Sequence, residues 1–321
     1  MTQTTRRPAG RSAPLALQAG DGTDWIRPRR SLLRRLRPVT KLLLVLPWTM
    51  VCGVVQTLML LLPVGSKTMV PRLYWRGMCA ILDIRVRLVG AVAHATADRR
   101  PVVYVSNHSS WLDVLVLGAQ LDACFTAKEE VGRWPVIRTI ARLGRTVYVR
   151  RQRNSTARER DEMRDRLAAG DNLILFPEGT TSDGARVLAF RSAFLSIAEL
   201  PVTAAGKPPI VQPISLVYDR LSGLPMGRAT RPYLAWFGDM DIASHYWQLA
   251  QRGGMRASVL MHAPLDPRDF PNRKALAQAI WRASADGAAA LRQNRPAQPA
   301  PAPQTSPQPA MPPTAAPSAL A

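Results

Sequence analysis

A histidine and an aspartate five residues apart have the side chains best suited to acid–base chemistry in this chain. His108 and Asp113 lie in the segment NHSSWLD, residues 107–113, directly after the apolar run Val102–Val105. An imidazole can remove a proton from a hydroxyl group when a carboxylate holds one ring nitrogen and the other faces the substrate. The pair therefore indicates a general base, provided that the fold brings the two side chains together.

Helix geometry decides whether the two side chains can meet. Five residues on an ideal helix turn by about 500°, so the side chains would diverge by about 140°. They meet only if His108 lies in a loop and Asp113 in the first helical turn, which Ser109 and Ser110 permit as N-cap residues. Ser110-x-x-Asp113 is also a capping-box-like pattern, in which Asp113 would cap a helix and His108 would have no chemical role. The residues alone leave both interpretations open.

A second polar loop follows another apolar run. Residues 173–176 read LILF, and residues 177–182 read PEGTTS. Gly179 has no Cβ, so the backbone can approach a ligand there, and neighbouring N–H groups can bind oxygen atoms. A base with a partner and a glycine-bearing loop after a strand are the components of an acyl-transfer site.

Four sequence blocks occur in one order along the chain. They are N-H-x-x-x-x-D at 107–113, a glycine followed by a hydrophobic strand and arginines at 144–151, FPEGTTS at 176–182, and a hydrophobic run containing proline at 210–214. In their order and spacing these blocks resemble the glycerolipid acyltransferases, the family of 1-acylglycerol-3-phosphate acyltransferases. The similarity covers residues 40–265, approximately.

The resemblance implies a role for each matching residue. It implies catalytic roles for His108 and Asp113, and substrate-binding roles for Arg150, Arg151, Glu178, Gly179, Thr180 and Pro213. An arginine can give a bidentate contact to a phosphate, and Arg151 fits that role better by position than Arg150 does. Glu178 is expected to bind an acceptor hydroxyl or to order its loop, and Pro213 to shape the acyl or donor pocket. The alternatives are a solvated arginine cluster, ordinary turn polarity at Glu178 and a strand-edge proline.

The resemblance also implies a reaction. A fatty acyl group would move from acyl-CoA or acyl-carrier protein to the free hydroxyl of 1-acylglycerol-3-phosphate, giving phosphatidic acid without a covalent enzyme intermediate. These donors are co-substrates, and no cofactor or metal is expected. One alternative is an acyltransferase for another lyso-lipid, such as a lyso-ornithine lipid, which lacks the phosphate. An alternative of another class is a non-catalytic basic protein that binds membranes.

The charge of the chain indicates anionic partners. The formal net charge is +21 over 321 residues. Positive residues gather just before an apolar segment, namely Arg27, Arg29, Arg30, Arg34, Arg35, Arg37 and Lys41. This placement favours an anionic membrane surface over nucleic acid, for which no recognition motif is found. The expected partners are therefore a lysophospholipid, an acyl thioester, the membrane surface and acyl-carrier protein.

The apolar segment Leu42–Leu62 is long enough to enter a membrane. Its 21 residues carry no charge, and as a helix they would extend about 31 Å. Pro47, Gly53 and Gln56 weaken a straight span and favour a kink or re-entrant hairpin, while a buried core helix is the alternative. Together with an interfacial helix at 70–82, the segment predicts a monotopic or hairpin anchor in the cytoplasmic membrane, with the catalytic domain facing the cytoplasm.

The remaining pattern predicts the fold class. Short apolar strands alternate with amphipathic helices, which indicates an α/β fold with a mixed, largely parallel sheet flanked by helices. The expected domains are a basic flexible N-terminus at 1–38, a membrane anchor at 39–82, an acyltransferase domain at 83–292 and a disordered Pro/Ala-rich tail at 293–321.

Overall fold

The computed structural model describes residues 32–61, 69–95, 100–128, 144, 146–149 and 156–302. The strands within these ranges are β1 (Ile84–Val89), β2 (Val102–Ser106), β3 (Cys124–Lys128), β4 (Val147–Val149), β5 (Leu173–Leu175), β6 (Ile210–Leu221), β7 (Leu224–Pro225) and β8 (Met255–Met261). The α-helices are α1 (Leu32–Leu61), α2 (Met69–Ile81), α3 (Leu112–Gln120), α5 (Thr156–Ala168), α6 (Ile242–Ala250) and α7 (Arg273–Arg292). Three 3₁₀ segments accompany them within the same ranges: η3 (Ser192–Glu199), η4 (Arg231–Tyr233) and η5 (Pro267–Asp269).

The described strands form one eight-stranded sheet. Its order is β1-β8-β6-β2-β5-β3-β4, with β7 paired to β6 outside this path. Neighbours are parallel except where β6 meets β7 and β8. The predicted mixed, largely parallel sheet is confirmed.

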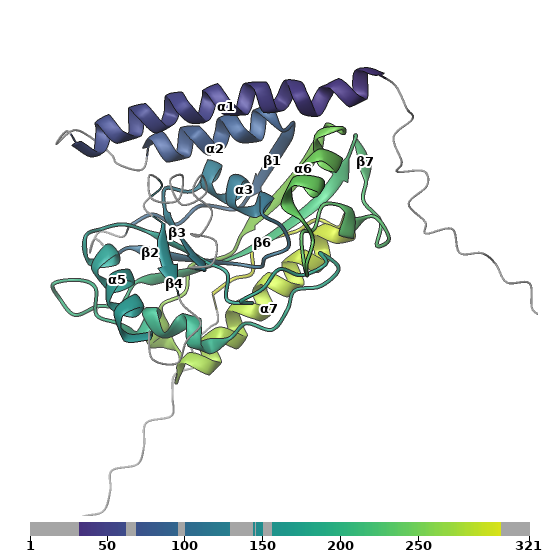
Figure 1. Ribbon diagram of the computed structural model, residues 1–321. Coiled ribbons are helices and arrows are strands. Elements are labelled where there is room, and N and C mark those ends of the chain that lie inside the picture. Colours follow the sequence, from purple (N-terminus) through teal and green to yellow (C-terminus); the bar gives the residue numbers. More distant parts are fainter. Residues whose placement is uncertain are drawn as a thin grey trace, which may run out of the picture.

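Helices cover both faces of the sheet. In β2, Tyr104 packs on the side of α2 and α3, whereas Val103 and Val105 pack with residues of η3 and α7. This alternation follows from the two-residue period of a strand. Figure 1 shows α1, α2 and α3 on one side of the sheet and α7 on the other.

The helices α1 and α2 form an antiparallel hairpin along that first side (Figure 1). The helix α1 begins at Leu32, inside the segment predicted to be a flexible N-terminus, so that boundary was wrong. It continues through Pro38 and Pro47, and the predicted re-entrant turn within it does not occur. The helix α2 packs against α1 instead, and the Trp48 indole Nε1 donates to the Tyr74 carbonyl at 3.1 Å to join them.

The two faces of α1 differ. Residues at helical spacing face the domain, among them Lys41, Cys52 and Gln56, which are buried. Large apolar side chains lie exposed on the remaining surface: Leu42, Leu43, Leu44, Leu46, Met50, Val51, Val54, Val55, Leu58, Leu60 and Leu61. Residues Leu36–Leu61 are long and apolar enough to cross a membrane by length and composition. The helix is therefore a candidate membrane segment with one face docked on the domain.

The helix α2 lies deeper than predicted. An interfacial helix would place its length at the surface, but Tyr74, Met78 and Cys79 are buried between α1 and α3. Gly118 of α3 leaves the space that the Trp75 ring occupies, since a Cβ at this position would lie 2.3 Å from that ring. The hairpin is therefore part of the folded domain and not a separate appendage.

The segment after the PEGTTS turn is the 3₁₀ segment Ser192–Glu199, which begins only after Arg191, because Arg191 is extended and its N–H bonds to the Pro177 carbonyl at 2.9 Å. One further prediction needs correction. The first ten residues of the predicted disordered tail are ordered. The Ala300 N–H donates to His262 Nδ1 at 2.9 Å, and the Ala263 N–H donates to the Ala300 carbonyl at 3.1 Å.

Candidate active site

His108 and Asp113 meet at the carboxyl end of β2. His108 lies in the loop after the strand, and Asp113 lies in the first turn of α3. The distance between His108 Nδ1 and Asp113 Oδ2 is 2.8 Å. The loop placement that helix geometry requires is therefore the one found.

The two interpretations of Asp113 are both realised at one oxygen atom. Besides the imidazole, Asp113 Oδ2 accepts the backbone N–H groups of Ser109 at 2.7 Å and Ser110 at 3.0 Å. The Asp113 N–H in turn donates to the Ser110 carbonyl at 3.0 Å. Asp113 thus closes the start of α3 and holds the imidazole at the same time, so capping does not exclude a chemical role.

Tyr218 completes the surroundings of this carboxylate. Its hydroxyl donates to Asp113 Oδ1 at 2.7 Å, and the Asp113 side chain is 0% exposed. Burial and the negative charge of Asp113 hold the Tyr218 pKa well above its usual value, so the phenol remains a donor at neutral pH. Each Asp113 oxygen is therefore satisfied, which a buried carboxylate requires.

These contacts leave one nitrogen of His108 available. An ionised carboxylate only accepts hydrogen bonds, so Nδ1 must carry the donated proton and Nε2 must carry the lone pair. The His108 side chain is 21% exposed, and no hydrogen bond to Nε2 is found among the described residues. The imidazole is thus held in the tautomer that can accept a proton from an incoming group.

Aromatic packing fixes the plane of the imidazole. The His108 ring stacks on Phe176 with centroids 4.1 Å apart and an interplanar angle of 18°. Phe176 stacks in turn with Phe125 at 6.4 Å, and Phe125 meets the edge of Trp75 of α2 at the same separation. The aromatic series joins the histidine loop to the α1–α2 hairpin.

Glu178 ties the two polar loops together. It is 2% exposed, and its Oε1 accepts the His108 N–H at 2.9 Å while Oε2 accepts the Leu188 N–H at 3.2 Å. The Ser182 N–H donates to the His108 carbonyl at 2.9 Å and adds a second link. Burial raises the Glu178 pKa to about 8 despite these backbone bonds. These contacts favour the loop-ordering interpretation of Glu178 over binding of an acceptor hydroxyl.

The other predicted residues lie in different settings. Gly179 adopts φ +71°, where a side chain would be strained, and its N–H bonds to the Phe176 carbonyl at 3.2 Å. Thr180 is exposed on this turn. Pro213 lies in the central strand β6, opposite Val105, and not at a sheet edge. Strand alternation places Pro213 with Val211 and Val217 on the α7 face, whereas Tyr218 faces Asp113 on the other side. The strand-edge alternative for Pro213 was therefore wrong, and its expected role in shaping the acyl or donor pocket stays a prediction.

Arg150 and Arg151 lie outside the described residues, so their phosphate-binding role stays a prediction. Sequence reasoning did not find Tyr218, which shares its strand with the fourth block but lies after it. The only available signal was strand spacing, because Tyr218 is five residues beyond Pro213 and so on the opposite face.

Comparisons with known proteins identify the family. Residues 85–217 match the family model described as "Acyltransferase". The lyso-ornithine lipid O-acyltransferase of Brucella abortus is 38% identical over 227 residues, which are 70% of this chain and 84% of that protein. This chain belongs to the glycerolipid acyltransferase family. The predicted family and enzyme class are confirmed, and the protein is an acyltransferase.

Two other relatives add detail. The 1-acyl-sn-glycerol-3-phosphate acyltransferase of Neisseria meningitidis serogroup B is 28% identical, covering 64% of this acyltransferase and 75% of that chain. The crystal structure of the 1-acyl-sn-glycerophosphate acyltransferase PlsC from Thermotoga maritima aligns with a TM-score of 0.53 and 20% identity. The alignment covers 80% of this chain and 98% of that chain. At this identity the PlsC structure supports the fold alone.

Proposed function

We propose that this acyltransferase moves a fatty acyl group from an acyl thioester to the free hydroxyl of a lyso-lipid, with His108 as the general base. The observation that carries the proposal is the imidazole held by Asp113 through Nδ1 at 2.8 Å, with Nε2 left to face a substrate. General-base catalysis of this kind contributes about 10²- to 10⁴-fold to a rate.

The reaction balances without a covalent enzyme intermediate. His108 Nε2 takes the hydroxyl proton, the oxygen attacks the thioester carbonyl carbon, and a carbon–oxygen bond forms. The carbon–sulfur bond then breaks, and the leaving thiolate takes the proton from the imidazolium. Asp113 stabilises the imidazolium between these steps, and the Tyr218 hydroxyl keeps the carboxylate in place. Acyl-CoA and acyl-carrier protein both supply the required thioester.

We propose a lyso-ornithine lipid as the first candidate acceptor. The Brucella abortus relative named for that activity is 38% identical to this chain, against 28% for the Neisseria meningitidis relative whose name specifies 1-acylglycerol-3-phosphate. This order reverses the expectation from the sequence blocks, which placed 1-acylglycerol-3-phosphate first. The Neisseria meningitidis relative keeps 1-acylglycerol-3-phosphate as the second candidate.

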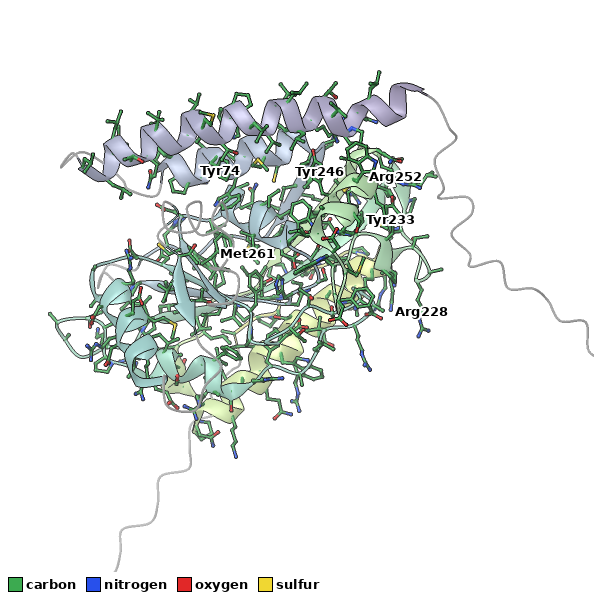
Figure 2. The ribbon with its side chains drawn as sticks, in the orientation of Figure 1. Tyr74, Arg228, Tyr233, Tyr246, Arg252 and Met261 are labelled. Carbon is green, nitrogen blue, oxygen red and sulfur yellow. The ribbon has the colours of Figure 1, made fainter. Side chains whose placement is uncertain are left out.

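The enzyme is proposed to work at a membrane surface with α1 lying in the plane of one leaflet. Lys41 Nζ near the start of the helix forms an ion pair with Asp83 at 2.9 Å, and Trp48 bonds to α2 further along. Tyr246 of α6 also donates to the Pro38 carbonyl at 3.2 Å, and Figure 2 shows Tyr246 beneath α1. A perpendicular crossing would have to break these contacts, whereas an in-plane helix keeps them and buries its apolar face. We place this surface at the cytoplasmic membrane, where the thioester donors are available.

A purified-enzyme assay tests the proposal. Wild type and His108→Ala are incubated with radiolabelled acyl-CoA or acyl-carrier thioester and with lyso-ornithine lipid, 1-acylglycerol-3-phosphate and monoacylglycerol. We expect wild type to acylate lyso-ornithine lipid fastest and His108→Ala to be inactive while still binding anionic vesicles. Near-normal turnover in His108→Ala would reject the catalytic base. Vesicle binding without any acyl transfer by wild type would support the non-catalytic alternative.

A further inference from the structure

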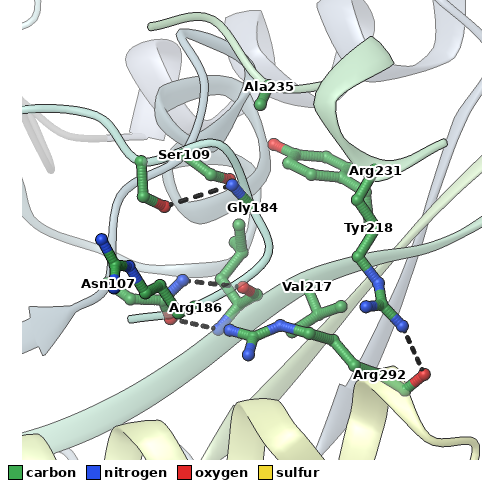
Figure 3. Close-up of a pocket in the computed structure, with 11 residues that line it drawn as sticks. Asn107, Ser109, Gly184, Arg186, Val217, Tyr218, Arg231, Ala235 and Arg292 are labelled. Atoms are coloured by element: carbon green, nitrogen blue, oxygen red, sulfur yellow. Dashed lines mark hydrogen bonds between the residues drawn. The ribbon is translucent and has the colours of Figure 1, made fainter. Parts of the chain in front are cut away.

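A pocket beside the histidine loop is lined by three arginines. Arg186 comes from the loop after the PEGTTS turn, Arg231 from η4 and Arg292 from the last turn of α7. The remaining wall includes Asn107, Ser109, Ser182, Gly184, Val217 and Tyr218. Figure 3 shows the Arg231 guanidinium beside the Arg292 backbone carbonyl, and the Arg292 side chain extending from there towards Asn107 and Arg186.

The positive charge in this pocket has no counter-charge within hydrogen-bonding reach. No described carboxylate forms an ion pair with Arg186, Arg231 or Arg292. Arg292 Nε is fully buried and has no hydrogen-bond partner among the described residues. Arg231 Nη2 donates to the Arg292 backbone carbonyl at 2.8 Å, a contact that holds Arg231 at the end of α7 and neutralises neither cation.

This arrangement is costly in the absence of a ligand. Burial lowers the Arg292 pKa to about 10, and the neighbouring Arg231 acts in the same direction, whereas the nearby carboxylates of Glu178 and Asp183 raise it. Buried charges in proteins are ordinarily paired, and an unpaired guanidinium nitrogen loses its hydration without compensation. An oxyanion in the pocket would supply the missing acceptors, and the planar guanidinium fork suits carboxylate and phosphate oxygens.

The pocket adjoins the reacting groups through the protein backbone. Asn107 and Ser109 precede and follow His108, and consecutive Cα atoms are about 3.8 Å apart. Asn107 is a fixed wall, because its side chain donates to the Leu216 carbonyl at 2.9 Å and accepts the Leu216 N–H at 2.8 Å. Tyr218 borders the pocket and also bonds to Asp113. An anionic group held here would lie beside the loop that carries His108, although the His108 side chain does not itself line the pocket.

We infer that the Arg186–Arg231–Arg292 pocket binds the oxyanion of the acceptor's headgroup and thereby positions the acceptor hydroxyl at His108. This inference rests on the proposed function. Ornithine offers a carboxylate and glycerophosphate offers a phosphate, so both candidate acceptors carry the required chemistry. The acyl donor presents its thioester to the same hydroxyl and is not the ligand of this pocket.

The test compares Arg186→Gln and Arg292→Gln with Arg228→Gln. Arg186 is exposed at the pocket edge, so its replacement should not disturb folding. Arg292 is half-buried, and Arg292→Lys provides a second variant at this position that keeps the charge. Arg228 is the matched control, because it is an exposed arginine near Arg231 that does not line the pocket (Figure 2). Melting temperatures close to that of wild type establish that each variant is folded.

The kinetic measurement separates the acceptor from the donor. We expect Arg186→Gln and Arg292→Gln each to raise the acceptor KM by about tenfold or more, with the donor KM changed less than about twofold. Arg292→Lys should fall between wild type and Arg292→Gln, and Arg228→Gln should match wild type. An unchanged acceptor KM in both glutamine variants would overturn the inference, and the three arginines would then have only a structural role.

The choice of acceptor identifies the anion. Lyso-ornithine lipid, its carboxyl methyl ester and 1-acylglycerol-3-phosphate are compared in wild type and Arg186→Gln. If Arg186 binds the carboxylate, the methyl ester should have a higher KM than the free acid with the wild-type enzyme, as Arg186→Gln has with the free acid. Combining the ester with Arg186→Gln should raise KM little further. A loss confined to 1-acylglycerol-3-phosphate would assign the pocket to phosphate. Equal use of acid and ester, with no effect on the phosphate acceptor, would reject the pocket as a headgroup site.

A binding experiment keeps this inference separate from the proposed reaction. Short-chain versions of the same acceptors are titrated calorimetrically into wild type and Arg186→Gln without any donor. Weaker binding by the variant supports the pocket even if no acyl transfer is found, in which case only the reaction has failed. Equal binding overturns the pocket, and the activity of wild type against His108→Ala then decides the reaction independently.

Discussion

His108 and His262 lie in the same domain, and both form hydrogen bonds, yet their surroundings differ in two ways. His262 uses both ring nitrogens: Nε2 bonds to the Ser215 hydroxyl at 2.9 Å, and Nδ1 accepts the Ala300 N–H at 2.9 Å. The Ser215 hydroxyl donates to the Ser284 carbonyl at 2.8 Å, so His262 Nε2 must donate to Ser215. His108 uses Nδ1 alone, and its partner is a carboxylate.

Exposure separates the two histidines further. His262 is 2% exposed, whereas the His108 side chain is 21% exposed. Burial lowers the His262 pKa to about 4, which keeps its ring neutral at physiological pH. A histidine whose two ring nitrogens are both hydrogen-bonded in the core, with no carboxylate bonded to either, supports packing and is not free to accept a proton from a substrate. A histidine with one nitrogen held by an acid and the other accessible can accept and return a proton.

Replacing each histidine with alanine tests the comparison most directly and has the largest expected effect. His108→Ala should lower kcat by about 10²- to 10⁴-fold with little change in melting temperature, because a partly exposed base is lost. His262→Ala should keep kcat per folded molecule within about twofold and lose about 2 kcal/mol of unfolding free energy, since Ser215 and Ala300 lose their buried partner. Steady-state kinetics and urea unfolding of both variants provide the check. A reversed pattern would show that the roles have been assigned to the wrong histidines.

A smaller effect is expected from Tyr218→Phe, which tests how much the hydrogen bond to Asp113 contributes to catalysis by His108. The substitution removes the hydroxyl that donates to Asp113 Oδ1 at 2.7 Å and keeps the ring. A hydrogen bond to a charged group contributes about 1.5–3 kcal/mol, so kcat should fall by roughly tenfold while both KM values stay near wild type. Steady-state kinetics with both substrates measures this division. If kcat is unchanged, the phenol has only a packing role.

The smallest effect is the contribution of His262 to the pH dependence of the unfolding free energy. Because the folded-state pKa of about 4 lies below the unfolded value of 6.5, the unfolded chain binds the extra proton as pH falls. The contribution of His262 is therefore present above pH 6.5 and is lost as the pH falls towards 4. Between pH 7 and 5.5 the contribution of His262 should fall by about 1 kcal/mol, so wild type should lose about 1 kcal/mol more than His262→Gln does.

Urea unfolding of wild type and His262→Gln at the two pH values measures the difference in slope. His245, whose pKa burial also lowers, contributes in the same direction to both proteins and cancels. Equal slopes would mean that His262 does not titrate differently in the folded and unfolded states.

Much of the fold and part of the candidate site follow from local sequence. The alternation of short apolar strands and helices was sufficient to predict the mixed sheet, because the spacing of apolar residues and the order of the elements along the chain determine which strands can pair. The contact between His108 and Asp113 also depends on local geometry, namely a loop residue and a first-turn residue five positions apart. Both features are encoded within a few residues of where they occur.

Features that depend on distant residues were not predictable in this way. Tyr218 reaches Asp113 across 105 positions, and the three pocket arginines come from three separate elements. The start of α1 was misjudged because its first turns are basic, whereas the helix is stabilised further on by contacts of Lys41 with Asp83. The sequence indicated that Glu178 binds the substrate, but its carboxylate oxygens accept hydrogen bonds from the His108 and Leu188 N–H groups.

The apolar outer face of α1 has a kinetic consequence. In the proposed arrangement, with α1 held in one leaflet, the enzyme would meet a lipid acceptor by diffusion in two dimensions, so its rate would depend on the acceptor's mole fraction in the surface and not on its bulk concentration. Diluting the acceptor with inert lipid should therefore slow the reaction even when the total amount of acceptor per volume is constant.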